Sequence, residues 1–114
     1  MSRQASGFKA WVIQRVTAVY IALFVLYAVA QFAVNAPADV VEWRAWMALP
    51  VVSMALLLFF AALLMHAWIG IRDVLIDYVH PLSLRVVVLS AFAIALIGTG
   101  LWVAQVIFLV RVAG

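Results

Sequence analysis

Residues 45–71 read AWMALPVVSMALLLFFAALLMHAWIGI and contain no charged side chain. A helix needs about 20 apolar residues to cross the hydrocarbon core of a bilayer, so this run is long enough to span it. Two further uncharged runs cover residues 16–38 and 86–110. Lipid offers no partners to open backbone, and three segments cannot close a barrel. The sequence therefore predicts an all-α membrane protein with three transmembrane helices.

The composition agrees with this prediction. Of the 114 residues, 71% are hydrophobic and only 10% are charged, whereas a typical soluble domain has about 25% charged residues. The seven Lys and Arg residues are scattered singly, which is too sparse for a nucleic-acid-binding stripe. The chain has no cysteine, so it can hold no disulfide, no thiolate-bound metal and no iron–sulfur cluster of its own.

The connections between the runs are short and leave no room for a soluble domain. Pro37 and Pro81 interrupt them, and Asp39 is a candidate start for a helix. We expect neither a cleaved signal peptide nor a transit peptide at the amino-terminal end. We expect a single membrane-anchor domain over residues 1–114, with helices over roughly 14–35, 45–75 and 84–111.

The distribution of Lys and Arg predicts the orientation in the membrane. One side carries five basic residues and the other carries two. They are Arg3, Lys9, Arg15, Arg72 and Arg85 on the first side, and Arg44 and Arg111 on the second. Because basic residues accumulate on the cytoplasmic side, we expect a cytoplasmic amino terminus and a periplasmic carboxyl terminus. The predicted location is the bacterial cytoplasmic (inner) membrane.

His66 is a candidate functional residue, because a histidine inside a membrane span is costly without a partner. The spacing leaves three interpretations open: an axial ligand of haem, a hydrogen bond to a neighbouring helix, or a proton relay. Gly70 lies one turn further on the same face and would leave room for a flat ligand. The other histidine, His80, is about 20 Å further along a helix, so any second histidine ligand must come from another chain.

Arg15, at the start of the first span, also has two interpretations. Its side chain can extend to lipid headgroups, as such arginines commonly do. It can instead bind an anionic group such as a haem propionate through its rigid fork of donors. Lys9 has the same two alternatives.

Asp77 and Tyr78 lie just beyond the end of the second span. Tyr78 fits the aromatic belt at a membrane interface, but an acid at the carboxyl end of a helix gains nothing from the helix dipole. A phenol beside a carboxylate can hydrogen-bond a quinone carbonyl and deliver protons to it. From spacing alone, both interpretations stay open.

Three segments together resemble a known family. They are QRVTAVY at residues 14–20, HAWIG at 66–70 and DYVHPLSLR at 77–85. Their order and spacing resemble the hydrophobic membrane-anchor subunit of bacterial succinate dehydrogenase, a three-helix subunit of the cytochrome b556 type. The resemblance covers the whole chain in length and number of helices, and its most specific part is His66 to Arg85.

This resemblance implies roles for individual residues. It implies that His66 is an axial ligand of haem b, whose second ligand belongs to the sister cytochrome b anchor subunit. It implies that Tyr78 hydrogen-bonds a carbonyl of ubiquinone, with Asp77 beside it. It implies that Arg15 lies near the haem propionates, and Lys9 stands where the family can carry a histidine, which gives it a possible propionate contact.

The resemblance also implies the function of a membrane anchor in succinate dehydrogenase, the succinate:ubiquinone oxidoreductase of respiratory complex II. The chain would join a heteromeric helix bundle in the lipid bilayer and hold a flavoprotein subunit and an iron–sulfur subunit at the inner face. Nothing in this chain could itself oxidise succinate, and no nucleic-acid partner is expected. Two alternatives stand beside this interpretation: an anchor of fumarate reductase, and a non-redox membrane scaffolding subunit.

Overall fold

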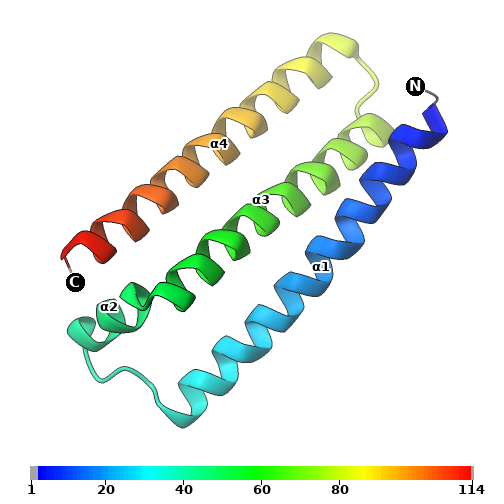
Figure 1. Ribbon diagram of the computed structural model, residues 1–114. Helices are drawn as coiled ribbons and strands as arrows, with labels where there is room; N and C mark the ends of the chain where they lie inside the picture. The colour runs from blue at the N-terminus through cyan, green and yellow to red at the C-terminus, as the bar shows by residue number, and fades with distance from the viewer. Residues whose placement is uncertain (1–2, 114) are drawn as a thin grey trace.

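Three long helices lie side by side in the computed structural model, which describes the backbone of residues 3–113 and the side chains of residues 7–113 (Figure 1). The helices are α1 (Arg3–Val34), α2 (Val40–Ala48), α3 (Pro50–Tyr78) and α4 (Leu82–Ala113). Those long and apolar enough to cross a membrane are Gly7–Val34, Pro50–Tyr78 and Leu82–Ala113. No strand is present in the described range. The prediction of an all-α protein with three transmembrane helices is therefore confirmed.

The helix expected over 45–75 is wrong at its start, because the chain breaks there into two helices. Pro50 is the first residue of α3, and Leu49 before it is extended, with ψ of 132°. A residue that precedes proline avoids the helical region, which ends α2 at this point. The short helix α2 begins where Asp39 caps it: the Asp39 carboxylate accepts a hydrogen bond from the Glu42 backbone N–H at 2.9 Å.

The other expected bounds are also too short. α1 begins well before residue 14, and α4 extends beyond 84–111 at both ends. An uncharged run marks only the part of a helix that lies in lipid. The preceding residues include no proline, and some of them, such as Lys9 and Ala10, are good helix formers, so α1 continues through them.

α3 is the central helix of the layer, with α1 packed on one side and α4 on the other. On α4, the residues that face inward recur every three or four positions, as expected for a helix with one packed face. They are Leu89, Ala93, Leu96, Gly100, Val103 and Ile107. At Gly100 the side chain of Leu64 on α3 packs closely against α4, since an added Cβ would lie 3.0 Å from its Cδ1. Small residues commonly permit such contacts between membrane helices.

Polar side chains join the helices at two places near the α2 end of the layer. The hydroxyl of Tyr20 on α1 donates a hydrogen bond to the carbonyl oxygen of Ala55 on α3 at 2.7 Å. The hydroxyl of Ser53, which is fully buried, donates to the carbonyl oxygen of Met47 at 2.6 Å. Both hydroxyls therefore have a backbone carbonyl as partner within the layer.

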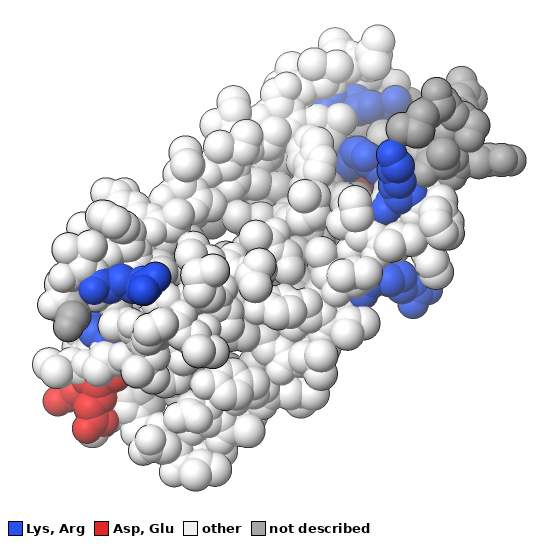
Figure 2. Space-filling model, viewed as in Figure 1, with Lys and Arg blue, Asp and Glu red and all other residues white. Residues whose placement is uncertain are grey.

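Most of the apolar surface is uncovered. In the described part of the chain, the buried hydrophobic side chains are Val52, Leu56, Ile69 and Ile107. Figure 2 shows Lys and Arg gathered at the two ends of the molecule, with an uncharged middle between them. Such a surface is stable against lipid tails or against other membrane helices, and unsuited to water.

Candidate functional site

His66 lies on α3 and contacts α1. Its Nδ1 atom is 3.1 Å from Oγ1 of Thr17, and both side chains are half-buried. This is a hydrogen bond between two helices, one of the three interpretations that the sequence left open for His66. Within the described residues, Nε2 of the same imidazole has no hydrogen-bond partner. The site therefore uses one ring nitrogen for a helix contact and leaves the other available.

Thr17 is a residue of this site that the sequence did not reveal. It lies within the family-like segment 14–20, yet nothing in that segment predicts a role for it. Its hydroxyl also contacts two carbonyl oxygens of its own helix: that of Ile13 at 2.7 Å and that of Gln14 at 3.1 Å. A threonine in a helix commonly bonds the carbonyl four residues earlier, so sequence alone gives no signal of the second partner.

Gly70 lies one turn after His66, and the space above its Cα is occupied by α1. A Cβ added at Gly70 would meet Nε2 of Gln14 at 3.7 Å, an ordinary contact. The Oε1 atom of Gln14 is buried and has no hydrogen-bond partner in the described part of the chain. We expected room for a flat ligand here; on the Cβ side of Gly70, that room is filled by Gln14.

Arg15 is at the same end of α1 as Thr17 but on another face. Successive residues of a helix are rotated by about 100°, so Arg15 points well away from the Thr17 side chain. Its guanidinium lies over the ring of Trp11, 5.3 Å from the ring centre, and it is exposed. Lys9 is also exposed. Neither basic side chain is brought against His66, and both face outward from the helix pair.

Asp77 and Tyr78 form the last two residues of α3, and both are exposed. The Tyr78 side chain has 78% of its surface accessible. Twelve residues at about 1.5 Å each separate it from His66 by roughly 18 Å along the helix axis. Tyr78 therefore lies at the end of the layer, well away from His66, which lies further inside it.

Arg85, on the first turn of α4, forms hydrogen bonds with backbone carbonyls on both sides of Tyr78. Its Nε donates to the carbonyl oxygen of Val79 at 3.0 Å, and its Nη2 donates to that of Ile76 at 3.1 Å. These carbonyls lie at the carboxyl end of α3, one in its last turn and one just beyond it, where carbonyls lack helical partners and a cation is favoured. From the sequence, Arg85 was expected only to orient the chain, and this contact was missed.

The remaining polar residues near this end include Arg72, Asp73 and His80, which lie at the surface. Arg72 and Asp73 form an exposed ion pair at 3.3 Å. His80 lies in the connection between α3 and α4 and is exposed. No group of three or more His, Cys, Asp or Glu side chains in the described residues could hold a bare metal ion. In contrast to these exposed residues, His66 lies between α1 and α3.

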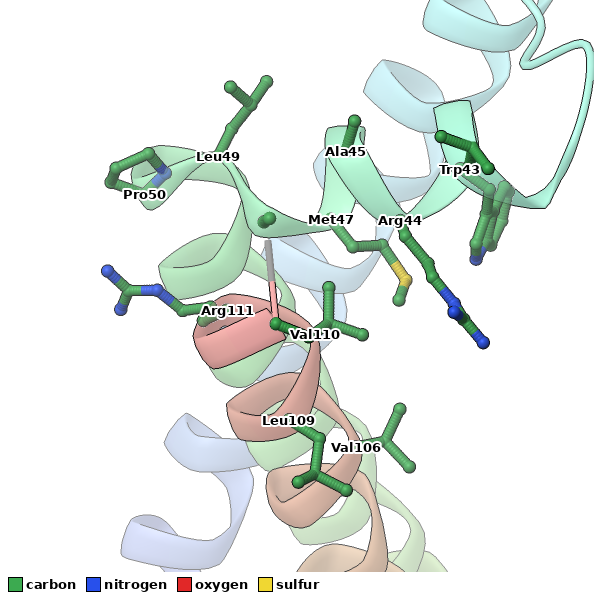
Figure 3. Close-up of a pocket in the computed structure, with 13 residues that line it drawn as sticks. Trp43, Arg44, Ala45, Met47, Leu49, Pro50, Val106, Leu109, Val110 and Arg111 are labelled. Carbon is green, nitrogen blue, oxygen red and sulfur yellow. The ribbon is translucent and has the colours of Figure 1, made fainter.

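Two apolar grooves lie at the opposite end of the molecule, near α2. The larger, of about 960 Å³, runs between α2 and the end of α4, and Figure 3 shows Arg44 and Arg111 at its edges, pointing in different directions. The smaller, of about 430 Å³, is lined by all four helices through side chains such as Phe59 and Trp102. Neither groove contains a residue that the sequence predicted to be functional.

Comparisons with known proteins agree with the three-helix membrane fold. The chain is 24% identical over 105 residues to the succinate dehydrogenase hydrophobic membrane anchor subunit of Coxiella burnetii (strain RSA 493 / Nine Mile phase I), covering 92% of this chain and 91% of that protein. Residues 1–105 match the family described as succinate dehydrogenase/fumarate reductase transmembrane subunit. With its three apolar helices, the chain is a multi-pass inner-membrane protein. It belongs to the succinate dehydrogenase/fumarate reductase transmembrane subunit family.

Proposed function

We propose that this chain is the membrane-anchor subunit of a succinate:ubiquinone oxidoreductase and supplies one axial ligand of haem b. The observation that carries the proposal is the environment of His66. Its Nδ1 contacts Thr17 of the neighbouring apolar helix α1, while its Nε2 has no hydrogen-bond partner in the described residues. Imidazole is a common axial ligand of haem iron, and apolar walls suit a porphyrin.

The residues present fit such a group. The imidazole is half-buried, and Nε2 is free of any hydrogen bond in the described range. When bound, haem b supplies a one-electron carrier between the soluble subunits and the membrane. The chain has no cysteine and offers one histidine inside a helix pair. A second axial ligand would come from the sister cytochrome b subunit, against the uncovered faces of the three-helix layer.

For ubiquinone, the proposed binding residues are Tyr78 and Asp77. Both are exposed at the end of α3, where a lipid-soluble quinone and water can meet. The Tyr78 phenol would donate a hydrogen bond to a quinone carbonyl, and Asp77 would pass protons from water. Reduction of a quinone to a quinol takes two electrons and two protons, so a proton-conducting pair at the interface is suited to it.

The two basic residues of α1 are proposed to bind anionic groups near the haem. Arg15 is exposed and stacks on Trp11, so its outward donors could reach a propionate on the side of the partner subunit. Lys9 is proposed for a second propionate contact. We also propose that residues 1–114 form one anchor domain with a cytoplasmic amino terminus.

The partners follow from the uncovered surface. α1 and α4 both pack on α3, and large apolar side chains on each remain exposed, such as Leu26 and Ile94. The sister anchor subunit would cover part of this surface and lipid the rest. The flavoprotein and iron–sulfur subunits would dock on the end that carries Tyr78, because the excess of basic residues predicts that this end faces the cytoplasm.

The experiment that tests this function is co-purification. The chain is expressed with an affinity tag in its native host and purified in mild detergent. The expected result is a complex with a flavoprotein and an iron–sulfur protein that reduces ubiquinone with succinate. Recovery of the chain without these two partners and without that activity would contradict the proposal.

One observation favours a second candidate. The Thr17–His66 hydrogen bond joins α1 to α3, and such a bond between helices is also what a histidine would provide in a non-redox scaffolding subunit. In that case the purified complex would show no haem b absorption. An anchor of fumarate reductase differs from the favoured function only in the direction of electron flow, and the quinone extracted from the complex distinguishes the two.

A further inference from the structure

The hydroxyl of Thr17 makes three polar contacts although it has one proton to give. Oγ1 lies 2.7 Å from the carbonyl oxygen of Ile13, 3.1 Å from that of Gln14, and 3.1 Å from Nδ1 of His66. Carbonyl oxygens only accept hydrogen bonds, so the hydroxyl proton is the only one available for them. We assign that proton to the shortest contact, the one to the Ile13 carbonyl.

The proton between Thr17 and His66 must then come from the imidazole. A hydroxyl oxygen that donates to a carbonyl still has lone pairs, and these accept from Nδ1–H. In a neutral imidazole only one nitrogen is protonated. Protonation at Nδ1 therefore leaves the lone pair of Nε2 free, which is the form that can bind a metal.

We infer that Thr17 is a positioning residue that fixes the tautomer and ring orientation of His66, so that Nε2 is the ligand atom. This inference rests on the proposed haem ligation by His66. The contacts form a chain of donors from Nδ1–H of His66 through the hydroxyl of Thr17 to the carbonyl of Ile13. Metal-binding histidines generally donate their other ring proton to an acceptor, which orients the ring and makes the ligand more basic.

The surroundings explain why an acceptor from α1 has this role. In lipid, no water is present to accept the Nδ1 proton, and the Thr17 hydroxyl of the neighbouring helix is the acceptor within reach. The Thr17 hydroxyl is held in place by its own helix, so it loses little freedom on making the contact. Asp73, the nearest acid along α3, is exposed and pairs with Arg72.

The test compares three variants in the purified, fully assembled complex. Thr17→Val removes the hydroxyl and keeps the shape, and Thr17→Ser keeps the hydroxyl. Thr99→Val is the matched control, because the Thr99 hydroxyl donates to the carbonyl oxygen of Ala95 at 2.8 Å and has no other partner in the described residues. The measurements are the midpoint potential of haem b and the rate at which haem is lost to an excess of an acceptor apoprotein.

In the Thr17→Val variant, haem should be bound about 10–100-fold less tightly, the usual loss when such a partner is removed. Its midpoint potential should be more positive, since a less basic imidazole stabilises ferric iron less. Thr17→Ser and Thr99→Val should match the unaltered complex. The inference is overturned if Thr17→Val leaves both quantities unchanged. It is also overturned if Thr17→Ser shifts the midpoint potential. This second test can be made even if the Thr17→Val complex does not assemble.

A His66→Leu variant separates this inference from the proposed function. Loss of haem b in His66→Leu with no effect of Thr17→Val would reject the role of Thr17 and leave ligation by His66 intact. Retention of an unchanged haem b spectrum in His66→Leu would instead reject ligation itself.

Discussion

Arg85 of α4 donates through its guanidinium to the carbonyl oxygen of Val79, at 3.0 Å, just beyond the residue that ends α3. A second bond from the same side chain reaches Ile76 at 3.1 Å. The two bonds from Arg85 thus attach the end of α3, where Tyr78 lies, to the first turn of α4. We call this pair of bonds the clamp. If the Tyr78 phenol binds a quinone carbonyl as proposed, these two bonds would help to hold it in position, because position and orientation contribute strongly to catalysis.

Replacement of Arg85 with Met should loosen the turn between α3 and α4. The two bonds to the carbonyls of α3 are worth about 1 kcal/mol each as a net contribution, so amides after Tyr78 should exchange with deuterium faster. The KM for quinone should rise several-fold, with dye-linked succinate oxidation unchanged. Arg85→Lys should be intermediate, because a lysine has no planar fork.

The control for this change is Arg72→Met. In the described residues, Arg72 bonds only the neighbouring side chain of Asp73. Exposed ion pairs contribute little to stability, so the KM for quinone should hardly change. Equal effects of Arg72→Met and Arg85→Met would show that the clamp has no particular role.

Replacement of Tyr78 with Phe should lower quinone reduction by succinate. If the phenol delivers a proton during the slow step, the loss should be about 100-fold. Succinate oxidation by an artificial dye should continue, since it bypasses the quinone. Tyr27→Phe is the control: Tyr27 is an exposed tyrosine of α1 that contacts Phe24 through its ring. A normal quinone reductase activity in Tyr78→Phe would contradict the assignment.

Replacement of Gly100 with Leu should destabilise the packing of α4 on α3. A Cβ at Gly100 already lies 3.0 Å from a methyl carbon of Leu64, and further atoms would force the helices apart. Overpacking of this kind typically costs about 1–3 kcal/mol. The complex should therefore lose haem and activity at a lower temperature. Gly98→Leu is the control, because a Cβ there meets no atom within 4 Å.

The orientation is tested by fusion of alkaline phosphatase after the last residue. The enzyme is active only outside the cytoplasm, and the excess of basic residues at the other end predicts an external carboxyl terminus. The fusion should be active, and a cytoplasmic reporter at the same place should be inactive. The reverse pattern would invert the topology.

Much of the fold could be predicted from the sequence, because charges bound each apolar run and lipid permits only helices there. The break at Leu49 was missed, since a proline near the end of an apolar run does not disturb the pattern of hydrophobicity. The bounds of α1 and α4 were too short because a helix can continue past the uncharged run that marks the lipid-spanning part, until a residue such as Pro81 stops it.

The candidate site could be predicted only in part. His66 could be predicted, because a histidine within an otherwise apolar run is unusual and needs no second residue to be noticed. Its partner Thr17 is far away in the sequence, and no local pattern tells which face of α1 meets α3. The same holds for Arg85, whose contacts with Ile76 and Val79 depend on how the turn brings α4 back to α3.

Ligation of haem b by His66 is the interaction on which the proposed function most depends. The most direct measurement is the reduced-minus-oxidised absorption spectrum of the purified complex carrying His66→Leu, beside one carrying His80→Leu. His80 is the other histidine of the chain, exposed in the turn after α3. We predict that haem b absorption is lost or strongly altered in His66→Leu and unchanged in His80→Leu. An unchanged spectrum in His66→Leu, with the complex assembled, would contradict ligation by His66.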